Sequence, residues 1–175
     1  MKIKKYLISF GSPDLKLTVK RFFNQANNFG YFDKVIVFSI NDLGKYNKEK
    51  LINLIKDKKK RKGYGFWFWK PLIIKKFLNK INDNDIIHYV DLGCHINSKG
   101  KRRLDHYIKK LNKSKNGMLC FQYKRLPGLN KDNFRYQDIY EYKYTKADLL
   151  HYFNVFNKKK ITKSAQYWAG RIILK

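Results

Sequence analysis

Short apolar runs alternate along this chain with longer segments whose apolar residues recur at helical spacing. Such runs, when turn-forming residues bound them, are typical of buried strands. They predict strands at residues 6–10, 35–38, 85–90, 118–123 and 172–174. The segments between them predict helices that begin after Ser12, at Asn47, at Pro71, near Lys101 and after Thr145. Strands that alternate with helices indicate one α/β domain over residues 1–175, with a mainly parallel sheet flanked by helices.

The last of these helices is expected to bury its apolar residues, which are Leu149, Tyr152, Phe153 and Phe156. Residues 124–144 precede it without clear periodicity, and a long loop of this kind in a compact domain is often functional. In a parallel α/β sheet the carboxyl ends of the strands and the amino ends of the helices share one edge, where ligands bind. We therefore expect the ligand site at that edge.

The chain is strongly basic, because 40 Lys and Arg against 13 Asp and Glu give a formal net charge of +27. A charge of this size points to nucleic acid, an anionic membrane or phosphorylated ligands as partners. The basic residues are 33 Lys and 7 Arg, whereas Arg supplies the bidentate contacts that nucleic-acid recognition favours. Asn, Ile, Tyr and Phe, which have A/T-rich codons as Lys does, are also abundant. Codon composition therefore explains the charge better than a nucleic-acid surface does.

The three longest basic runs follow expected helices, at residues 58–62, 109–115 and 158–160. Cations at helix C-termini complement the helix dipole. Those helix ends lie opposite the ligand edge in a parallel α/β domain, so most of the charge is expected to face away from the site. This positive charge then either reflects codon composition alone or forms a patch that holds the chain near an anionic membrane. Lys70 and residues 99–103 are the basic residues expected on the ligand side.

Cysteine usage and the N-terminus indicate a cytoplasmic location. The chain has two cysteines, Cys94 and Cys120, which make no disulfide framework. The first apolar stretch ends at Gly11, too early for the core of a signal peptide. No apolar run approaches the ~18 residues of a membrane span, so we expect a cytoplasmic protein that is at most peripheral at the inner face of the membrane.

Asp91 directly follows the strand expected at residues 85–90, at its carboxyl end. Strand alternation puts Ile87, Tyr89 and Asp91 on one side of the sheet. A carboxylate at this position meets a ligand or a metal in the crevice, and Gly93 permits a tight turn or a close backbone approach. The same position also suits a carboxylate that caps the following turn, and the spacing alone does not separate these two roles.

The segment at residues 63–71 reads Gly-Tyr-Gly-Phe-Trp-Phe-Trp-Lys-Pro and is the densest aromatic stretch of the chain. Aromatic residues ahead of a helix usually belong to the core. Two glycines and a lysine before a helix start also suit anion binding, which places Lys70 to bind a phosphate or to pair with Asp91. His95 is the candidate to complete a metal site with Asp91, although a lone loop histidine is more often exposed or hydrogen-bonded locally.

This aromatic segment and the run Asp-Ile-Ile-His-Tyr-Val-Asp-Leu-Gly-Cys at residues 85–94 resemble a bacterial group of GT-A-type glycosyltransferases of capsule and lipopolysaccharide synthesis. Weaker matches lie at residues 23–26, 32–33, 144–149 and 166–170. The resemblance implies a GT-A-like nucleotide-diphospho-sugar transferase domain. Such an enzyme, of the hexosyltransferase type, moves a sugar from a nucleotide-diphosphate donor to a glycan or lipid-linked acceptor in cell-surface polysaccharide synthesis.

The resemblance also implies roles for individual residues. Asp91 occupies the Asp-x-Asp position, which holds a divalent metal and the donor diphosphate, and is the expected catalytic residue. The donor-binding residues that it implies are Ser9, Phe10, Gly11, Gly65, Trp69, Lys70, Asp91 and Gly93. Gln166 and Gly170 are expected to face the sugar or the acceptor.

The chain departs from the family pattern in two places. Gly93 stands where Asp-x-Asp has its second carboxylate, so a Mn²⁺ or Mg²⁺ cofactor would rest on Asp91 with His95 as a further ligand, or Asp91 would bind sugar hydroxyls instead. Relatives continue past residues 166–170, so the resemblance implies a C-terminally truncated domain. The alternatives are a non-enzymatic basic module that binds nucleic acid or an anionic membrane, and an inactive glycosyltransferase-like fragment.

Overall fold

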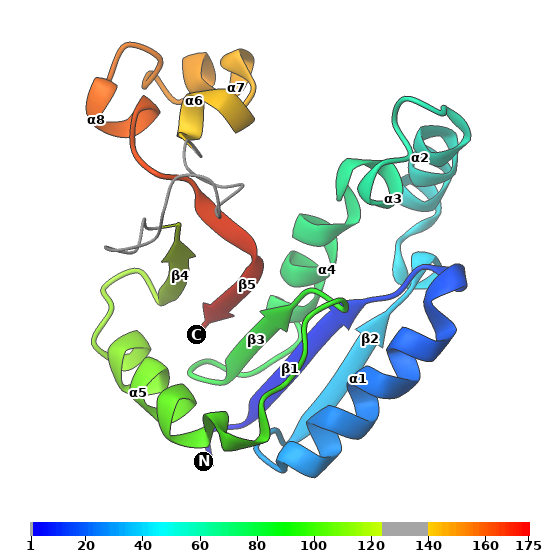
Figure 1. Ribbon diagram of the computed structural model, residues 1–175, viewed down its shortest axis with the longest axis vertical. Helices are drawn as coiled ribbons and strands as arrows, with labels where there is room; N and C mark the ends of the chain where they lie inside the picture. Colours follow the sequence, from blue (N-terminus) through cyan, green and yellow to red (C-terminus); the bar gives the residue numbers. More distant parts are fainter. Residues whose placement is uncertain (1, 124–139) are drawn as a thin grey trace, which may run out of the picture. The chain divides into compact units, whose positions relative to one another are not determined.

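The computed structural model describes residues 2–123 and 140–175. The chain divides into two compact units. The first unit contains Met1–Leu119 and Gly170–Lys175, and the second contains Cys120–Ala169. Figure 1 shows the path of the chain through the helices and strands. Each unit is described below by itself.

A five-stranded sheet has the strand order β2-β1-β3-β5-β4. Its strands are β1 (Lys5–Phe10), β2 (Lys34–Phe38), β3 (Ile86–Val90), β4 (Met118–Gln122) and β5 (Tyr167–Leu174). β1 pairs in parallel with both β2 and β3, which confirms the parallel part of the prediction. β5 lies antiparallel to β3, with Ile87 opposite Leu174. The sheet is therefore mixed rather than mainly parallel.

The reversed strand follows from how the chain returns from β4. The Lys175 N–H donates to the Gly117 carbonyl at 2.9 Å, and the Tyr123 N–H donates to the Gln166 carbonyl at 3.0 Å. The end of β5 thus lies beside the start of β4, and its beginning lies beside the end of β4. An apolar run predicts that a strand exists but not its direction. The strand expected at residues 172–174 is the last part of this longer strand.

The helices mostly agree with the predicted positions. In the first unit they are α1 (Lys16–Phe29), α2 (Lys45–Lys56), α3 (Gly63–Phe66), α4 (Trp69–Leu78) and α5 (Lys101–Asn112), with 3₁₀ turns η1 (Pro13–Leu15), η2 (Ile40–Asp42) and η3 (Ser98–Gly100). Gly30 ends α1 in the left-handed conformation, with φ at 58°. Glycine adopts this conformation without steric cost, so the predicted stop signal acts as expected.

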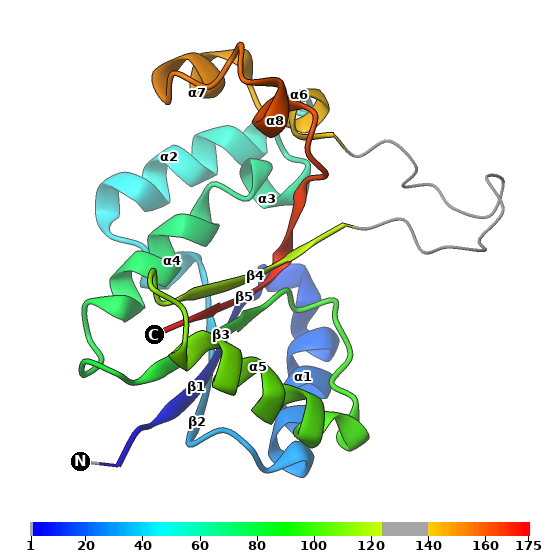
Figure 2. The ribbon, with the colours of Figure 1, turned by 90° about the vertical axis from the view of Figure 1, so that its left-hand side faces the viewer.

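Side chains alternate along β1 and β3, so that α1 and α4 cover opposite faces of the sheet (Figure 2). The α4 face buries Ile8, Phe10, Ile73, Phe77, Ile87 and Tyr89. The α1 face buries Leu7, Phe22, Ala26, Val90 and Leu92. The prediction that Ile87 and Tyr89 share one side of β3 is confirmed. Each such side chain stabilises the fold by roughly 1.5–3 kcal/mol through apolar burial.

Residues 99–103 do not lie on the ligand side of the sheet, contrary to the prediction. The Lys101 ammonium lies 5.8 Å from the Phe29 ring at the C-terminal end of α1, which is the edge opposite Asp91. The chain after β3 runs back along α1 before α5 begins, and this return was not visible in the periodicity. Lys99, Arg102, Arg103 and His106 line a surface pocket of about 440 Å³ there.

The basic run at residues 58–62 is also placed differently from the prediction. Figure 1 shows α2 and α3 beyond the carboxyl ends of β1 and β2, and this run joins the two helices. The run therefore stands near the carboxyl edge of the sheet rather than opposite it. The run at residues 158–160 belongs to the second unit.

The second unit holds α6 (Glu141–Tyr144), α7 (Ala147–Tyr152) and α8 (Lys159–Thr162). The long loop expected at residues 124–144 thus ends in a short helix, while residues 124–139 lie outside the described residues. The expected burial of the last helix is wrong, because Leu149, Tyr152, Phe153 and Phe156 are 48%, 80%, 61% and 44% exposed. Leu150 is buried instead. α7 is apolar on two faces, and the sequence pattern does not tell which face turns inward.

In the part of the chain that the structure describes, no helix has the length and apolar character needed to cross a membrane.

A substitution at Gly65 tests how closely α3 packs against α2. The φ of Gly65 is +83°, and a Cβ built there would lie 2.6 Å from Leu51 Cδ1. We expect Gly65→Ala to lower the free energy of unfolding by about 2–4 kcal/mol, through a strained left-handed residue and local overpacking. Urea unfolding followed by circular dichroism measures this change.

Gly93→Ala is the matched control. A Cβ at Gly93 would meet no described atom within 4 Å, so we expect a change within about 0.5 kcal/mol. Equal losses in both variants would contradict this account of Gly65.

Candidate functional site

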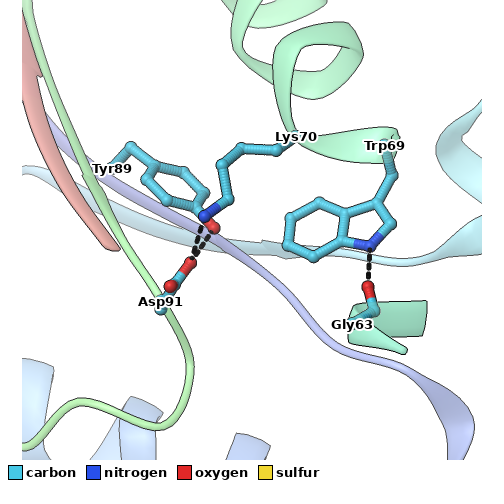
Figure 3. A network of polar contacts seen from close by, with 5 residues as sticks. All are labelled: Gly63, Trp69, Lys70, Tyr89 and Asp91. Atoms are coloured by element: carbon cyan, nitrogen blue, oxygen red, sulfur yellow. Dashed lines mark hydrogen bonds and ion pairs between the residues drawn. The ribbon is translucent and has the colours of Figure 1, made fainter. Parts of the chain in front are cut away.

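The two segments that the sequence singled out meet at the end of β3. Asp91 follows this strand, and its N–H donates to the Gly170 carbonyl at 2.8 Å. Lys70 lies in the first turn of α4, and its Nζ is 2.9 Å from Asp91 Oδ1. Figure 3 shows both side chains converging on one point. Of the two roles that the sequence leaves open for Lys70, the pairing with Asp91 is confirmed, and phosphate binding stays a prediction.

The Tyr89 hydroxyl donates a hydrogen bond to the same Asp91 oxygen (Figure 3). Burial and the neighbouring carboxylate raise the pKa of Tyr89 well above its usual range, so the hydroxyl remains a donor. The Lys70 ammonium also lies 5.0 Å from the centre of the Tyr89 ring, within the range of a cation–π contact. Both charged partners are thus held in place by the last residues of β3.

The ion pair is asymmetric in its exposure. The Lys70 side chain is 11% exposed and the Asp91 side chain is 34% exposed. A buried ammonium is stable only when a partner compensates its charge, and Asp91 is that partner. The carboxylate keeps a solvent-facing side, from which a hydroxyl or another polar group of a ligand can approach.

The aromatic segment ahead of Lys70 has an unusual backbone. Residues 63–67 all have positive φ, and three of them, Tyr64, Phe66 and Trp67, are not glycine. A left-handed residue with a Cβ costs roughly 1–2 kcal/mol. α3 is thus a left-handed turn, and strain of this kind persists only where the surroundings over-determine it.

Trp69 secures that turn. Its ring stacks on Phe10 with centroids 4.2 Å apart, and its Nε1–H donates to the Gly63 carbonyl at 3.3 Å (Figure 3). These contacts fix the first residue of α4 against the end of β1 and thereby position Lys70. Trp69 is 6% exposed, so its role here is to hold the turn, and a contact with a donor stays a prediction.

Arg21 of α1 holds the loop that follows Asp91. Its guanidinium donates to the Leu92 carbonyl at 2.6 Å and to the Cys94 carbonyl at 3.0 Å. Gln25, one turn further along α1, accepts from Arg21 at 2.7 Å and from the Ile96 N–H at 3.3 Å. Sequence analysis missed Arg21, whose one visible signal was that Arg is scarce in a chain rich in Lys.

The other predicted donor residues lie in different settings. Ser9 and Phe10 are buried, and Ser9 Oγ has no hydrogen-bond partner among the described residues. Gly11 is tightly surrounded, since a Cβ there would lie 2.9 Å from Val19 Cγ2. Gly65 is buried against α2, whereas Gly93 is exposed beside Asp91. Gly93 is therefore the predicted glycine at which a ligand can reach the backbone.

The predicted acceptor residues differ in position. The Gly170 carbonyl accepts the hydrogen bond from the Asp91 N–H described above, so β5 lies beside the site. Gln166 belongs to the second unit, where its carbonyl accepts from Tyr123. Its approach to a sugar stays a prediction.

The residues at Asp91 do not fit a divalent metal. Asp91 Oδ1 is taken by Lys70 and Tyr89, and a metal ion there would have to displace the ammonium. His95 Nδ1 lies 3.0 Å from Gln25 Nε2, so the imidazole helps to attach the loop after β3 to α1. Among the described residues no three or more His, Cys, Asp and Glu side chains form a metal-binding group. Mg²⁺ is usually held by one or two carboxylates together with phosphates and water, and here the ammonium 2.9 Å from the one candidate carboxylate repels a divalent cation.

The opposite face of β3 carries a second polar contact. The Arg171 Nε–H donates to His88 Nε2 at 2.9 Å, and the guanidinium lies 5.0 Å from the Tyr107 ring. Burial and the Arg171 charge lower the pKa of His88 to about 3. His88 is therefore neutral near pH 7 and acts as an acceptor, which ties β5 to β3 directly behind the Asp91 site.

His88 makes the stability of the fold pH-dependent. Its pKa is lowered in the folded state, so below the unfolded value of about 6.5 only the unfolded state binds the proton. We expect the wild type to lose about 2 kcal/mol more than His88→Gln between pH ~7.5 and pH ~5.0. Gln keeps an acceptor for Arg171 without titrating. Urea unfolding at both pH values measures the difference, and parallel pH profiles for the two proteins would refute it.

The Arg21 contacts predict a second effect. Lys cannot bridge two carbonyls as the guanidinium fork does, so Arg21→Lys leaves a loop carbonyl poorly satisfied. We expect a loss of about 1–3 kcal/mol in the free energy of unfolding. Lys20→Ala, at an exposed position on the same helix, is the control and should change stability by less than about 0.5 kcal/mol. An Arg21→Lys variant as stable as this control would contradict the assignment.

Comparisons of the chain with protein-family models, with curated proteins and with solved structures find no match.

Proposed function

We propose that this chain is a GT-A-like glycosyltransferase. It takes a sugar from a nucleotide-diphosphate donor and transfers it to a hydroxyl of a glycan or lipid-linked acceptor. The observation that carries the proposal is the contact between Lys70 and Asp91 at the carboxyl edge of the parallel strands. Ligands of α/β sheets bind at this edge, and both residues come from the segments that carry the family resemblance.

In the proposed reaction the bond from the anomeric carbon to the diphosphate oxygen breaks, the acceptor hydroxyl oxygen bonds to that carbon, and the hydroxyl proton is released to water. Negative charge then develops on the leaving diphosphate. A preorganised cation in a site with little water stabilises such charge strongly. Lys70 supplies it, because its ammonium is held at a fixed point by Asp91 and Tyr89 before any ligand arrives.

Asp91 has two tasks in this proposal. It compensates the Lys70 charge in the free protein, and its exposed side accepts a hydroxyl of the donor ribose or sugar. Gly93 follows at an exposed position without a side chain, which lets a bulky donor approach the backbone. Because the residues do not fit a divalent metal, no step here depends on one.

Donor binding tests the proposal. In a thermal-shift panel of UDP-, GDP-, dTDP- and CMP-sugars, at least one of the first three, which carry a diphosphate, should stabilise the protein in a saturable manner. We expect the same stabilisation in EDTA as in Mn²⁺, because Lys70 supplies the positive charge. Lys70→Met should weaken donor binding by about 10–100-fold, the usual value of a hydrogen bond to a charged group.

Lys75→Met is the matched control, since Lys75 is exposed on the same helix and the change in net charge is equal. It should leave donor affinity unchanged. Absence of binding by every nucleotide sugar, together with a nucleic-acid affinity that falls steeply with salt, would replace the proposal with a basic binding module. Donor binding without turnover on any acceptor would indicate an inactive glycosyltransferase-like protein.

A further inference from the structure

We propose that the second unit binds the surface of an anionic bilayer through its exposed aromatic and lysine side chains. We call this the aromatic–lysine surface and define it by Leu149, Tyr152, Phe153 and the run at residues 158–160. The inference rests on the second unit alone and does not depend on the proposed transferase activity.

α7 presents an apolar face to solvent. Leu149, Tyr152 and Phe153 are spaced i, i+3 and i+4, which places them together on one side of the helix. They are 48%, 80% and 61% exposed, while Leu150 on the other side is 5% exposed. Contiguous exposed apolar groups of this kind mark an interaction surface rather than an ordinary surface of a globular protein.

The exposed rings are also in contact with one another. Tyr152 and Phe153 meet edge to face with centroids 5.1 Å apart. Aromatic side chains with one apolar and one polar end favour the boundary between lipid chains and water. Tyr152, the most exposed of the group, has this character.

The charge of this unit selects the partner. Residues 140–169 contain six Lys, two acidic residues and no Arg, and residues 120–139 of the same unit add two Lys, two Arg and two Asp. All six Lys are exposed, and one of the acids, Glu141, accepts a hydrogen bond from the Thr145 hydroxyl. Lysine clusters bind the anionic leaflet at about 1 kcal/mol per residue. A lipid surface accommodates the lysines and the apolar face together, whereas nucleic acid would use only the charge.

Vesicle co-sedimentation of the full chain tests the inference. The vesicles contain phosphatidylcholine with about 30% phosphatidylglycerol, or phosphatidylcholine alone, in ~0.15 M salt. We expect binding to the anionic vesicles only. The double variant Leu149→Ser with Phe153→Ser should bind at least about tenfold more weakly, because two apolar side chains no longer insert. Leu17→Ser, at an 84% exposed position on α1, is the control and should bind as the wild type does.

A second pair of variants separates local binding from the general basic charge. Lys158, Lys159 and Lys160 are replaced together by Gln, and Lys109, Lys110 and Lys113 are replaced likewise in the control. Both variants lose the same charge at exposed positions. We expect the first to weaken binding by at least about tenfold and the second by less than about threefold. Equal losses would show diffuse attraction by the whole chain and overturn the proposal.

Two further results would also overturn it. One is anionic-vesicle binding that the double serine variant leaves unchanged. The other is self-association in the absence of lipid, measured by light scattering, that the same variant abolishes, because the surface would then face a second copy of the chain. Circular dichroism of each variant confirms that the fold is kept, which the exposed positions lead us to expect.

Discussion

The buried ammonium of Lys70 is the constraint on which the architecture around the site depends. The buried Lys70 needs a compensating charge, and the Asp91 carboxylate, which follows β3, supplies it. The chain brings the two together through the left-handed turn at residues 63–67. The stacking of Trp69 on Phe10 and the close fit of Gly65 on Leu51 hold that strained turn. Within the aromatic segment the buried Trp69 stabilises the geometry that presents the Lys70 ammonium, whereas Phe66 and Trp67 are 51% and 43% exposed.

β3 couples the site to the rest of the first unit. On one face of β3, Asp91 accepts a hydrogen bond from the Tyr89 hydroxyl and pairs with Lys70. On the other face, His88 accepts a hydrogen bond from Arg171 of β5. Arg21 of α1 then ties down the loop that leaves the strand. The position of Asp91 thus depends on the antiparallel strand as well as on its parallel neighbour. A charged group that is held in place before a ligand arrives stabilises the charge that develops at a reacting centre more strongly than a mobile one does.

The sequence pattern predicts features that depend on local order, such as the existence of helices and strands. It does not predict features that depend on the strand topology. The Lys70–Asp91 pairing was predictable because a strand end and a helix start share one edge in a βα arrangement. The direction of β5 was not predictable, since it follows from how the chain returns after β4. Arg21 was missed because its partners are backbone carbonyls of the loop 71 and 73 positions away, which leave no mark in the sequence. In α7 the spacing correctly indicated a helix. The helix has apolar residues on two faces, however, so the sequence does not tell which face is buried.

The placement of the basic residues changes what the net charge means for the site. Lys70 and Asp91 cancel, so the ion pair by itself offers no net attraction to a diphosphate. The run at residues 58–62, which joins α2 to α3, supplies positive charge at the same edge of the sheet instead. If the proposed function holds, a basic rim of this kind raises the local concentration of the anionic donor, and Lys70 provides the directed contact. Residues 99–103 lie at the opposite edge, close to the end of α1. The positive charge that the composition gives as a single number is thus divided among separate surfaces, so the contribution of each surface to binding has to be measured by itself.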